Sequence, residues 1–192
     1  MLRNAQIVRA LFAVLLFATP AFAEGDGPGP NLIIEVAGAA NGEIVIDLNP
    51  DIAPKHVAQI VALAKSGAYD NVVFHRVIDG FMAQTGDVQY GKKGGDTSMA
   101  GMGGSDLPNI KAEFSAVPFE RGIVGMARSQ DPDSANSQFF IMFAPGDFLN
   151  GQYTVVGKVI AGMDVVDQIK KGVGQNGEVP DPDVMTKVTV KE

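Results

Sequence analysis

Short apolar runs separated by turn residues set the fold class of this chain. The clearest division is Asn41-Gly42, which lies between an apolar run at residues 32–36 and an alternating run at residues 43–48. An Asn-Gly pair between two such runs is a strong short-range signal of a β-hairpin. Further strand-like runs follow at residues 72–76, 81–84, 112–114, 123–127, 137–142, 154–159 and 185–190. Together they predict roughly eight strands in a mostly antiparallel β-barrel.

Two segments have helical periodicity instead. Pro54 suits the first turn of a helix, and Gly67 is expected to end that helix. An apolar stripe at helical spacing lies between them: Val57, Ile60, Val61 and Ala64. His56 lies off this stripe without an acidic or histidine partner at i+4, so we expect it on the surface. A shorter helix is expected at residues 163–171, and both helices are expected to cap the barrel.

The first 23 residues have the pattern of a secretory signal peptide. Arg3 and Arg9 precede an apolar run at residues 11–18, and Ala-Phe-Ala at residues 21–23 is a small-x-small cleavage site. A membrane anchor is the alternative, but the run is shorter than the ~20 residues that a span needs. We expect cleavage after Ala23, a flexible linker at residues 24–30 and one domain at residues 31–192. The mature protein is then expected in the periplasm or outside the cell, free of the membrane.

Composition and two weak loop motifs exclude several function classes. The net charge of −7 disfavours nucleic-acid binding, and the absence of cysteine excludes disulfides and thiolate chemistry. The segment at residues 91–95 lacks the Gly-Lys-Ser/Thr of a phosphate-binding loop. The acidic segment at residues 131–136 lacks the glycine and the distal glutamate of a calcium loop. We therefore expect neither a metal nor a cofactor.

Residues 74–87 place a cation within an apolar hairpin. Arg76 stands next to His75 and before a turn at Gly80. An apolar pair and an amide follow the turn: Phe81, Met82 and Gln84. Because a guanidinium is always charged and offers a planar set of donors, this hairpin presents one fixed cation beside an apolar patch.

The strand at residues 137–142 places two neighbouring phenylalanines on opposite faces. With a period of two residues, Gln138 and Phe140 share one face, and Phe139 and Ile141 share the other. One phenylalanine is therefore expected in the core. The other is expected to line a pocket.

Three blocks of the sequence resemble, in order, the signature of the cyclophilin-type peptidyl-prolyl cis-trans isomerases. They are residues 74–87, residues 125–128 together with 134–141, and residues 148–159. The resemblance extends from about residue 31 to the C-terminus and looks like the bacterial exported branch. It implies a closed eight-stranded antiparallel β-barrel capped by two helices, with the site on its outer face. It also implies a monomer that acts without cofactors on proline-containing polypeptides, unfolded or newly exported.

The resemblance also implies roles for individual residues. Arg76 is expected to be the catalytic cation, with Gln84 holding it and bonding the substrate backbone. An apolar and aromatic set is expected to form the proline pocket and its surroundings: Phe81, Met82, Phe140, Phe148, Leu149 and Tyr153. Backbone groups of Ala127 and Arg128 are expected to pair with the extended peptide, and Gln138 is expected to support Gln84.

The chain departs from many eukaryotic members of that family at three positions. Those proteins have Trp in place of Phe148, His in place of Tyr153 and often Asn in place of Arg128. Phe148 can still close the pocket, but it lacks the indole N–H donor, so weak binding of cyclosporin is expected. His75 is expected to be structural, because rotation about a peptide bond moves no proton.

Two other classes of protein remain as alternatives. The first is a proline-peptide binding module or chaperone with little turnover, which would not need Arg76. The second is an unrelated secreted barrel that carries a small apolar ligand, which would need a roomy interior. The large apolar side chains expected inside the barrel argue against such a cavity.

Overall fold

The computed structural model describes residues 25–192. The predicted signal peptide and the first residue of the predicted linker lie outside the described residues. The regular elements are β1 (Asn31–Ala37), β2 (Gly42–Leu48), α1 (Pro54–Lys65), β3 (Val72–Val73), β4 (Arg76–Ile78), β5 (Met82–Thr85), β6 (Ile123–Met126), β7 (Phe139–Met142), β8 (Val155–Ala161), α2 (Met163–Gln168) and β9 (Val184–Lys191). Two short 3-10 helices, Pro132–Ser134 and Asp147–Leu149, lie in the loops.

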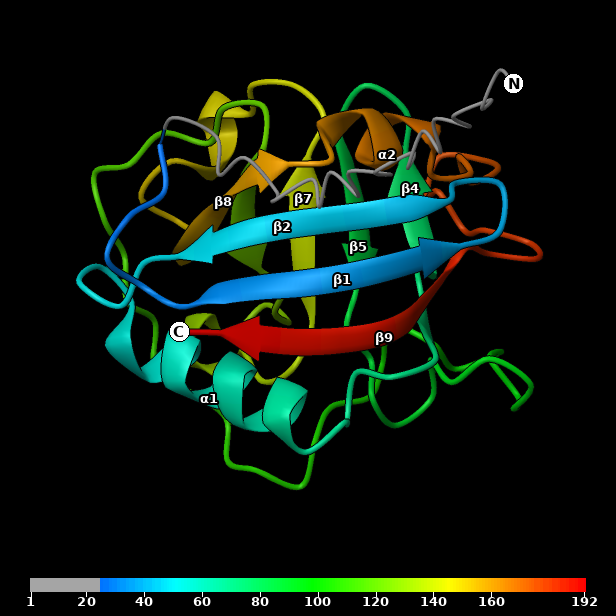
Figure 1. Ribbon diagram of the computed structural model, residues 1–192, viewed down its shortest axis with the longest axis horizontal. Coiled ribbons are helices and arrows are strands. Elements are labelled where there is room, and N and C mark those ends of the chain that lie inside the picture. Colours follow the sequence, from blue (N-terminus) through cyan, green and yellow to red (C-terminus); the bar gives the residue numbers. More distant parts are fainter. Residues whose placement is uncertain (1–24) are drawn as a thin grey trace, which may run out of the picture.

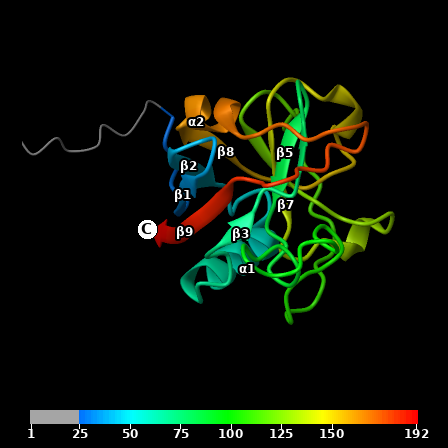
Figure 2. The ribbon, with the colours of Figure 1, turned by 90° about the vertical axis from the view of Figure 1, so that its right-hand side faces the viewer.

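These strands form one antiparallel sheet in the order β3-β9-β1-β2-β8-β6-β7-β5-β4. The sheet curls so that its two halves face each other. Figure 2 shows β1, β2 and β9 on one side and β5 and β7 on the other, with α2 and α1 at opposite ends of the space between them. Figure 1 shows the same arrangement from the side of β1. The fold is therefore a mostly-β half-barrel with two helices.

The expected closed barrel of eight strands is wrong in two respects. The sheet has nine strands, and among the described residues no ladder joins its edge strands, β3 and β4. These strands come from the single run expected at residues 72–76, which is divided at Phe74 and His75. The first part pairs with β9 and the second pairs with β5. Because the run is continuous in sequence, its pattern could not indicate this division.

The outer edge of β4 is covered by the loop that precedes β9. The N–H of Val77 donates to the carbonyl of Gly177 at 2.7 Å, and the N–H of Gly172 donates to the carbonyl of Val77 at 2.9 Å. The N–H of Val179 donates to the carbonyl of His75 at 3.2 Å. Since an uncovered edge strand has unpaired backbone groups, this loop completes the hydrogen bonding of the strand that carries Arg76.

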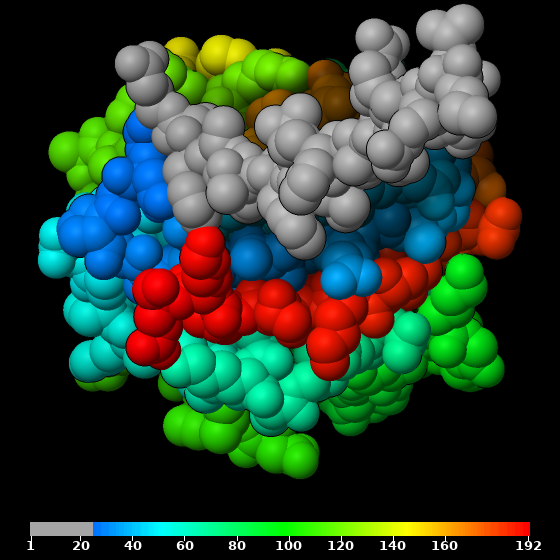
Figure 3. Space-filling model, in the orientation of Figure 1, coloured from blue at the N-terminus to red at the C-terminus, as the bar shows by residue number. Residues whose placement is uncertain are grey.

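The hairpin expected at Asn41-Gly42 is confirmed, and its first strand also pairs with the end of the chain. β1 pairs with β2 from Asn31 opposite Asp47 to Val36 opposite Gly42. On its other side β1 pairs with β9, with Asn31 opposite Lys191. In Figure 3 the side chains of β1 and β9 lie beside each other on the surface, next to those of α1. The first and last strands thus hold each other in place.

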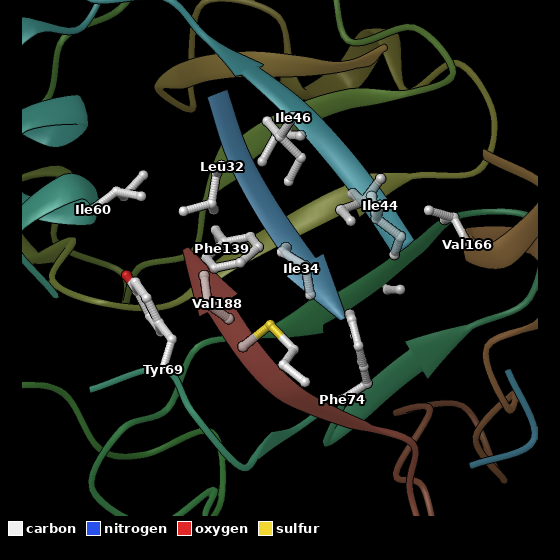
Figure 4. Close-up of a cluster of buried hydrophobic side chains, with 14 of the residues drawn as sticks. Leu32, Ile34, Ile44, Ile46, Ile60, Tyr69, Phe74, Phe139, Val166 and Val188 are labelled. Atoms are coloured by element: carbon white, nitrogen blue, oxygen red, sulfur yellow. The ribbon is translucent and has the colours of Figure 1, made fainter. Parts of the chain in front are cut away.

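The main hydrophobic core fills the space between the two halves of the sheet and the helices. Large aliphatic side chains from β1 and β2 meet Phe74, Phe139 and Tyr69 there, as Figure 4 shows. The ring of Tyr69 packs edge-on against Phe139 at 5.7 Å, and its hydroxyl donates to the carbonyl of Ser137 at 2.8 Å. Burying this polar tip is therefore tolerated, because the hydroxyl has a partner.

Helix α1 begins at Pro54 as expected, but its N-terminus is capped from a distance. Its N-cap residue, Ala53, has no side-chain cap. The carboxylate of Glu113 instead accepts hydrogen bonds from the N–H groups of Lys55 and His56, and it contacts Nδ1 of His56 at 2.7 Å. His56 is fully buried, so the expected surface position is wrong. Its acidic partner is distant in sequence rather than at i+4.

Two expected elements and the predicted linker differ in detail from the sequence-based expectation. Residues 112–114 form no strand, and α2 ends at Gln168 rather than near residue 171. The described part of the predicted linker lies against β2: Gly27 donates to the carboxylate of Asp47 at 3.0 Å. Within residues 25–192, no helix is long and apolar enough to cross a membrane.

Candidate functional site

The site is built on a row of residues that stand directly opposite one another across four strands. Arg76 in β4 faces Gln84 in β5, Gln84 faces Phe140 in β7, and Phe140 faces Gly125 in β6. The next row on the same face contains Met82 and Met142. Because side chains alternate between faces, these rows point away from the main core. The site therefore lies on the outer face of the half-barrel.

A cavity of about 220 Å³ opens over this face. Every predicted site residue except Gln138 lines it: Arg76, Phe81, Met82, Gln84, Ala127, Arg128, Phe140, Phe148, Leu149 and Tyr153. Gln138 lies behind Gln84 and lines an adjoining cavity of about 340 Å³. The structure thus brings the predicted residues together around one small hollow, where aromatic and aliphatic side chains stand beside the guanidinium groups of Arg76 and Arg128.

Arg76 is held at two of its nitrogens. Its Nη1 donates to Oε1 of Gln84 at 3.1 Å, and its Nε donates to the carbonyl of Asn176 at 2.9 Å. Burial lowers the pKa of Arg76, and the nearby Tyr153 acts in the opposite direction. A guanidinium nevertheless stays protonated in proteins, so Arg76 keeps its positive charge in a fixed orientation.

The sequence did not indicate the part played by Asn176. This residue lies in the loop that covers β4, far along the chain from Arg76. Its contact uses a backbone carbonyl, which any residue type could supply. No side-chain pattern could therefore have identified it.

Gln84 and Gln138 form a connected pair of amides. Nε2 of Gln84 donates to Oε1 of Gln138 at 2.9 Å, and Nε2 of Gln138 donates to the carbonyl of Gly103 at 2.8 Å. Gln138 is buried, as expected for a residue that supports Gln84 from behind. The pair fixes the acceptor that Arg76 uses.

An aromatic stack forms the floor of the cavity. Phe140 stacks on Phe119 at 5.7 Å and meets the edge of Tyr153 at 6.0 Å. Gly125 makes room for this stack, because a Cβ there would lie 2.5 Å from the Phe119 ring and 2.6 Å from the Phe140 ring. Phe119 lies outside the strands and is fully buried. The glycine within a strand was the available signal, since it often marks such a close approach.

The rim of the cavity is formed by a second aromatic pair. Phe148 is 65% exposed, and its ring lies 5.4 Å from that of Phe81. Leu149, the next residue in the same 3-10 helix, is buried below it. The exposed ring thus stands at the mouth of the hollow, while its neighbour belongs to the floor.

Arg128 and Ala127 border the cavity, and their hydrogen bonds restrict the expected pairing with a peptide. The N–H of Ala127 already donates to the carbonyl of Gln138 at 2.9 Å, so it is not free for a substrate. The guanidinium of Arg128 lies 4.3 Å from the centre of the Tyr153 ring and donates to the carbonyl of Gln152 at 3.0 Å. Arg128 therefore braces the aromatic wall.

His75 lies beneath the site with no task in proton transfer. It is 7% exposed, and Gly101 packs directly against its ring. Burial lowers the pKa of His75, and the Asp87 carboxylate opposes this shift only in part. Its ring is therefore neutral near pH 7. Within residues 25–192, no cluster of three or more His, Cys, Asp or Glu side chains is arranged to hold a metal ion.

The site is thus an outward-facing hollow on a curled antiparallel sheet, lined by aromatic and aliphatic side chains and by the fixed cation of Arg76. Residues 32–190 match the family model of cyclophilin type peptidyl-prolyl cis-trans isomerases. The chain therefore belongs to the cyclophilin family and is a peptidyl-prolyl cis-trans isomerase.

Relatives in bacteria are similar over most of their length. A probable peptidyl-prolyl cis-trans isomerase of Brucella suis is 54% identical over 188 residues, which is 96% of this chain and 94% of the relative. The peptidyl-prolyl cis-trans isomerase B of Escherichia coli is 40% identical over 167 residues, which is 79% of this chain and 96% of the relative.

Solved structures share the fold at lower identity. A cyclophilin-type isomerase of Cryptosporidium parvum, crystallised in the presence of the dipeptide Ala-Pro, has a TM-score of 0.71 and 26% identity, over 84% of this chain and 99% of that one. A cyclophilin of Hirschia baltica has a TM-score of 0.67 and 28% identity, over 83% of this chain and 73% of that one.

Proposed function

We propose that this isomerase accelerates rotation about Xaa-Pro bonds in exported polypeptides, with Arg76 as the catalytic residue and the adjoining hollow as the proline pocket. The observation that carries the proposal is the guanidinium of Arg76, held at two nitrogens on the edge of an apolar cavity. The dipeptide present with the Cryptosporidium parvum relative has the same chemistry as this substrate class.

Arg76 supplies the electrostatic part of the reaction. The barrier to rotation is about 18–20 kcal/mol, because amide resonance keeps the peptide bond planar. As the bond twists, the prolyl nitrogen becomes pyramidal and gains a lone pair that can accept a hydrogen bond. A guanidinium positioned there stabilises the twisted state more than the planar one, and this difference lowers the barrier.

The aromatic floor supplies the grip on the proline ring. Phe140 and Met82 are almost fully buried beneath the cavity, and Leu149 closes its lower wall. A hollow of this size and composition suits a five-membered aliphatic ring. Holding the ring also displaces water from around Arg76, which strengthens the interaction of its charge with the twisted amide.

Export is supported by the sequence alone. The pattern at residues 1–23 is that of a cleaved signal peptide, which would bring the mature protein to the periplasm or outside the cell as a soluble monomer. Unfolded and newly exported proteins would be its substrates there. Fractionation of cells that express the full chain, with N-terminal sequencing of the product, tests this. Product that stays in the cytoplasm with residues 1–23 attached contradicts it.

A binding module with little turnover remains the second candidate. The same hollow could bind proline without catalysis, but such a module would gain little from a guanidinium fixed at two nitrogens. The two functions differ in one measurable property, which is the rate of cis-to-trans exchange in a bound peptide.

The decisive experiment is protease-free cis-to-trans relaxation of an Xaa-Pro peptide. We expect strong acceleration by the chain that begins at Glu24, and a loss of about 10²-fold or more in Arg76→Ala. Circular dichroism checks that the variant folds. If neither protein accelerates exchange, yet both bind the peptide, the binding-module function replaces the enzymatic one.

A further inference from the structure

The sequence motif at residues 74–87 ends in Asp87, a residue for which the proposed mechanism has no use. We infer that Asp87 is a positioning residue for Arg76, acting through Gly103, Gln138 and Gln84. This inference rests on the proposed role of Arg76. In this inference, a buried carboxylate behind the site determines the orientation of the guanidinium that lines the pocket.

Asp87 is fully buried and holds four backbone N–H groups. Its Oδ1 accepts from Gln89 at 3.0 Å and from Tyr90 at 2.8 Å. Its Oδ2 accepts from Gly101 at 2.7 Å and from Gly103 at 2.9 Å. A buried carboxylate is costly unless it is fully hydrogen-bonded. These four bonds meet that need and leave the side chain with one orientation.

The carboxylate thereby fixes one point of an otherwise irregular loop. Between β5 and β6 the chain has no strand apart from isolated bridges, yet Gly101 and Gly103 are both bound to the same oxygen. The approach is so close that a Cβ on Gly103 would lie 2.5 Å from Oδ1 of Asp87. The carbonyl of Gly103 therefore has a defined position next to the site.

From that carbonyl a chain of hydrogen bonds runs to the guanidinium. Gln138 donates to the Gly103 carbonyl at 2.8 Å, and Gln84 donates to Gln138 at 2.9 Å. Arg76 then donates to Gln84 at 3.1 Å. Each amide uses its NH2 group toward the Gly103 end and its oxygen toward the Arg76 end. Reversing either amide would set two donors or two acceptors against each other, so the chain has one polarity.

This direction of hydrogen bonding presents an acceptor oxygen to Arg76. The acceptor oxygen of Gln84 faces the guanidinium only while Gln138 faces the loop, and Gln138 faces the loop only while the Gly103 carbonyl stays in place. Misplacing a catalytic group by about 1 Å can cost about 10²-fold in rate. A change at Asp87 should therefore appear as a loss of turnover, although Asp87 does not line the proline pocket.

The test is Asp87→Asn, which keeps the side-chain volume but replaces one acceptor oxygen by an NH2 group. We expect kcat to fall about tenfold with little change in KM, because the pocket stays intact while the cation loses its fixed orientation. The NMR signals of the Arg76 Nη1 protons, which donate to Gln84, should shift and broaden in this variant. That readout does not depend on turnover, so it remains informative if the protein proves to be a binder.

Asp183→Asn is the matched control. Asp183 is equally buried and also holds backbone N–H groups, those of Ala40 at 3.1 Å and Lys170 at 2.7 Å, but it lies outside the hydrogen-bond chain. We expect this variant to lose stability and keep its kcat at temperatures where it is folded. Equal losses of kcat in the two variants would show a general effect of removing a buried carboxylate, and would overturn the inference.

Gln138→Met measures the coupling between Asp87 and Arg76, the two ends of the row of hydrogen bonds. It removes the amide at nearly constant volume, and we expect a loss of kcat similar to that of Asp87→Asn. In the double variant the second change should add little, because both act on the same chain. Fully additive losses, or an unchanged kcat in folded Asp87→Asn, would overturn the inference. If Asp87→Asn does not fold, an unchanged kcat in Gln138→Met would also overturn the inference.

Discussion

Phe139 and Phe140 are neighbours in β7, yet they belong to two separate hydrophobic clusters. Phe139 lies in the main core, where Tyr69 closes against it. Phe140 lies in the smaller cluster on the outer face, between Phe119 and Tyr153. Both side chains are at least 95% buried by protein atoms. What differs is the far side of each cluster, which is enclosed for Phe139 and opens into the cavity for Phe140.

The comparison shows how one sheet can serve stability and binding together. Strands β5, β6 and β7 contribute one face to the main core and the other to the floor of the site. The rigid main core fixes the strand register, and the register places Arg76, Gln84 and Phe140 in one row. The main core therefore supports the site through the strands that the two clusters share.

The largest expected effect on stability is that of Phe139→Ala. Truncation would leave an enclosed void in the main core, which typically costs about 3–5 kcal/mol. Turnover at low temperature should stay near the wild-type value, because the outer face is not touched. Urea unfolding measures the first effect and peptide relaxation the second. A stable variant with low turnover would contradict the separation of the two clusters.

Phe140→Ala should lower activity more than it lowers stability. The space left by its ring would join the open cavity and admit water, so the loss of stability should be smaller than for Phe139→Ala. The pocket would lose its floor, and we expect kcat/KM to fall about tenfold or more. The same two measurements apply. Unchanged kcat/KM in a folded protein would show that Phe140 is only structural.

Glu113→Gln affects only the main-core side of the molecule, through α1. Losing a helix cap typically costs about 1 kcal/mol, and we expect unchanged turnover. Burial acts to raise the pKa of Glu113, but hydrogen bonds from the His56 ring and from the N–H groups of His56 and Lys55 outweigh it and lower the pKa. The folded chain therefore binds a proton at this group less readily than the unfolded chain does.

The sign of the pH dependence follows from this difference. The contribution of Glu113 should be complete above the ordinary glutamate pKa of about 4.3 and be lost as the pH falls through the lower pKa of the folded state. The stability difference between wild type and Glu113→Gln should thus shrink between neutral and acid pH. Urea unfolding at several pH values measures it. A stability difference that grows as the pH falls would contradict the lowered pKa of Glu113 in the folded state.

The smallest expected effect is at the rim. Phe148 offers no hydrogen-bond donor, so cyclosporin should bind the wild-type protein weakly. Phe148→Trp adds one donor at an exposed position, which should raise affinity by about 1 kcal/mol, or roughly fivefold. Inhibition of peptide relaxation measures both proteins. Nanomolar inhibition of the wild type would contradict the expectation.

The parts of the fold that follow local periodicity could be predicted from the sequence. The Asn41-Gly42 hairpin, the first helix and the opposite faces of Phe139 and Phe140 each depend on spacing alone, and the structure confirms them. The site residues that the resemblance to the cyclophilin family implied lie around one cavity, with Gln138 directly behind it. Their roles in the reaction stay a prediction.

The features that could not be predicted depend on partners distant in the chain. His56 is buried because Glu113 reaches it from a loop. The run at residues 72–76 divides because its two parts pair with different strands. Phe119 is buried because Gly125 leaves room for its ring. In each case the local sequence is compatible with either outcome, and tertiary packing selects one.

The pairing of β1 with β9 has a consequence for the order in which the protein is made and folds. β1 is synthesised before every other strand of the sheet, but its partner β9 is synthesised after all of them. The sheet cannot be completed until β9 has been synthesised, and contacts of such long sequence separation form slowly. Until then, one edge of β1 is without its partner strand.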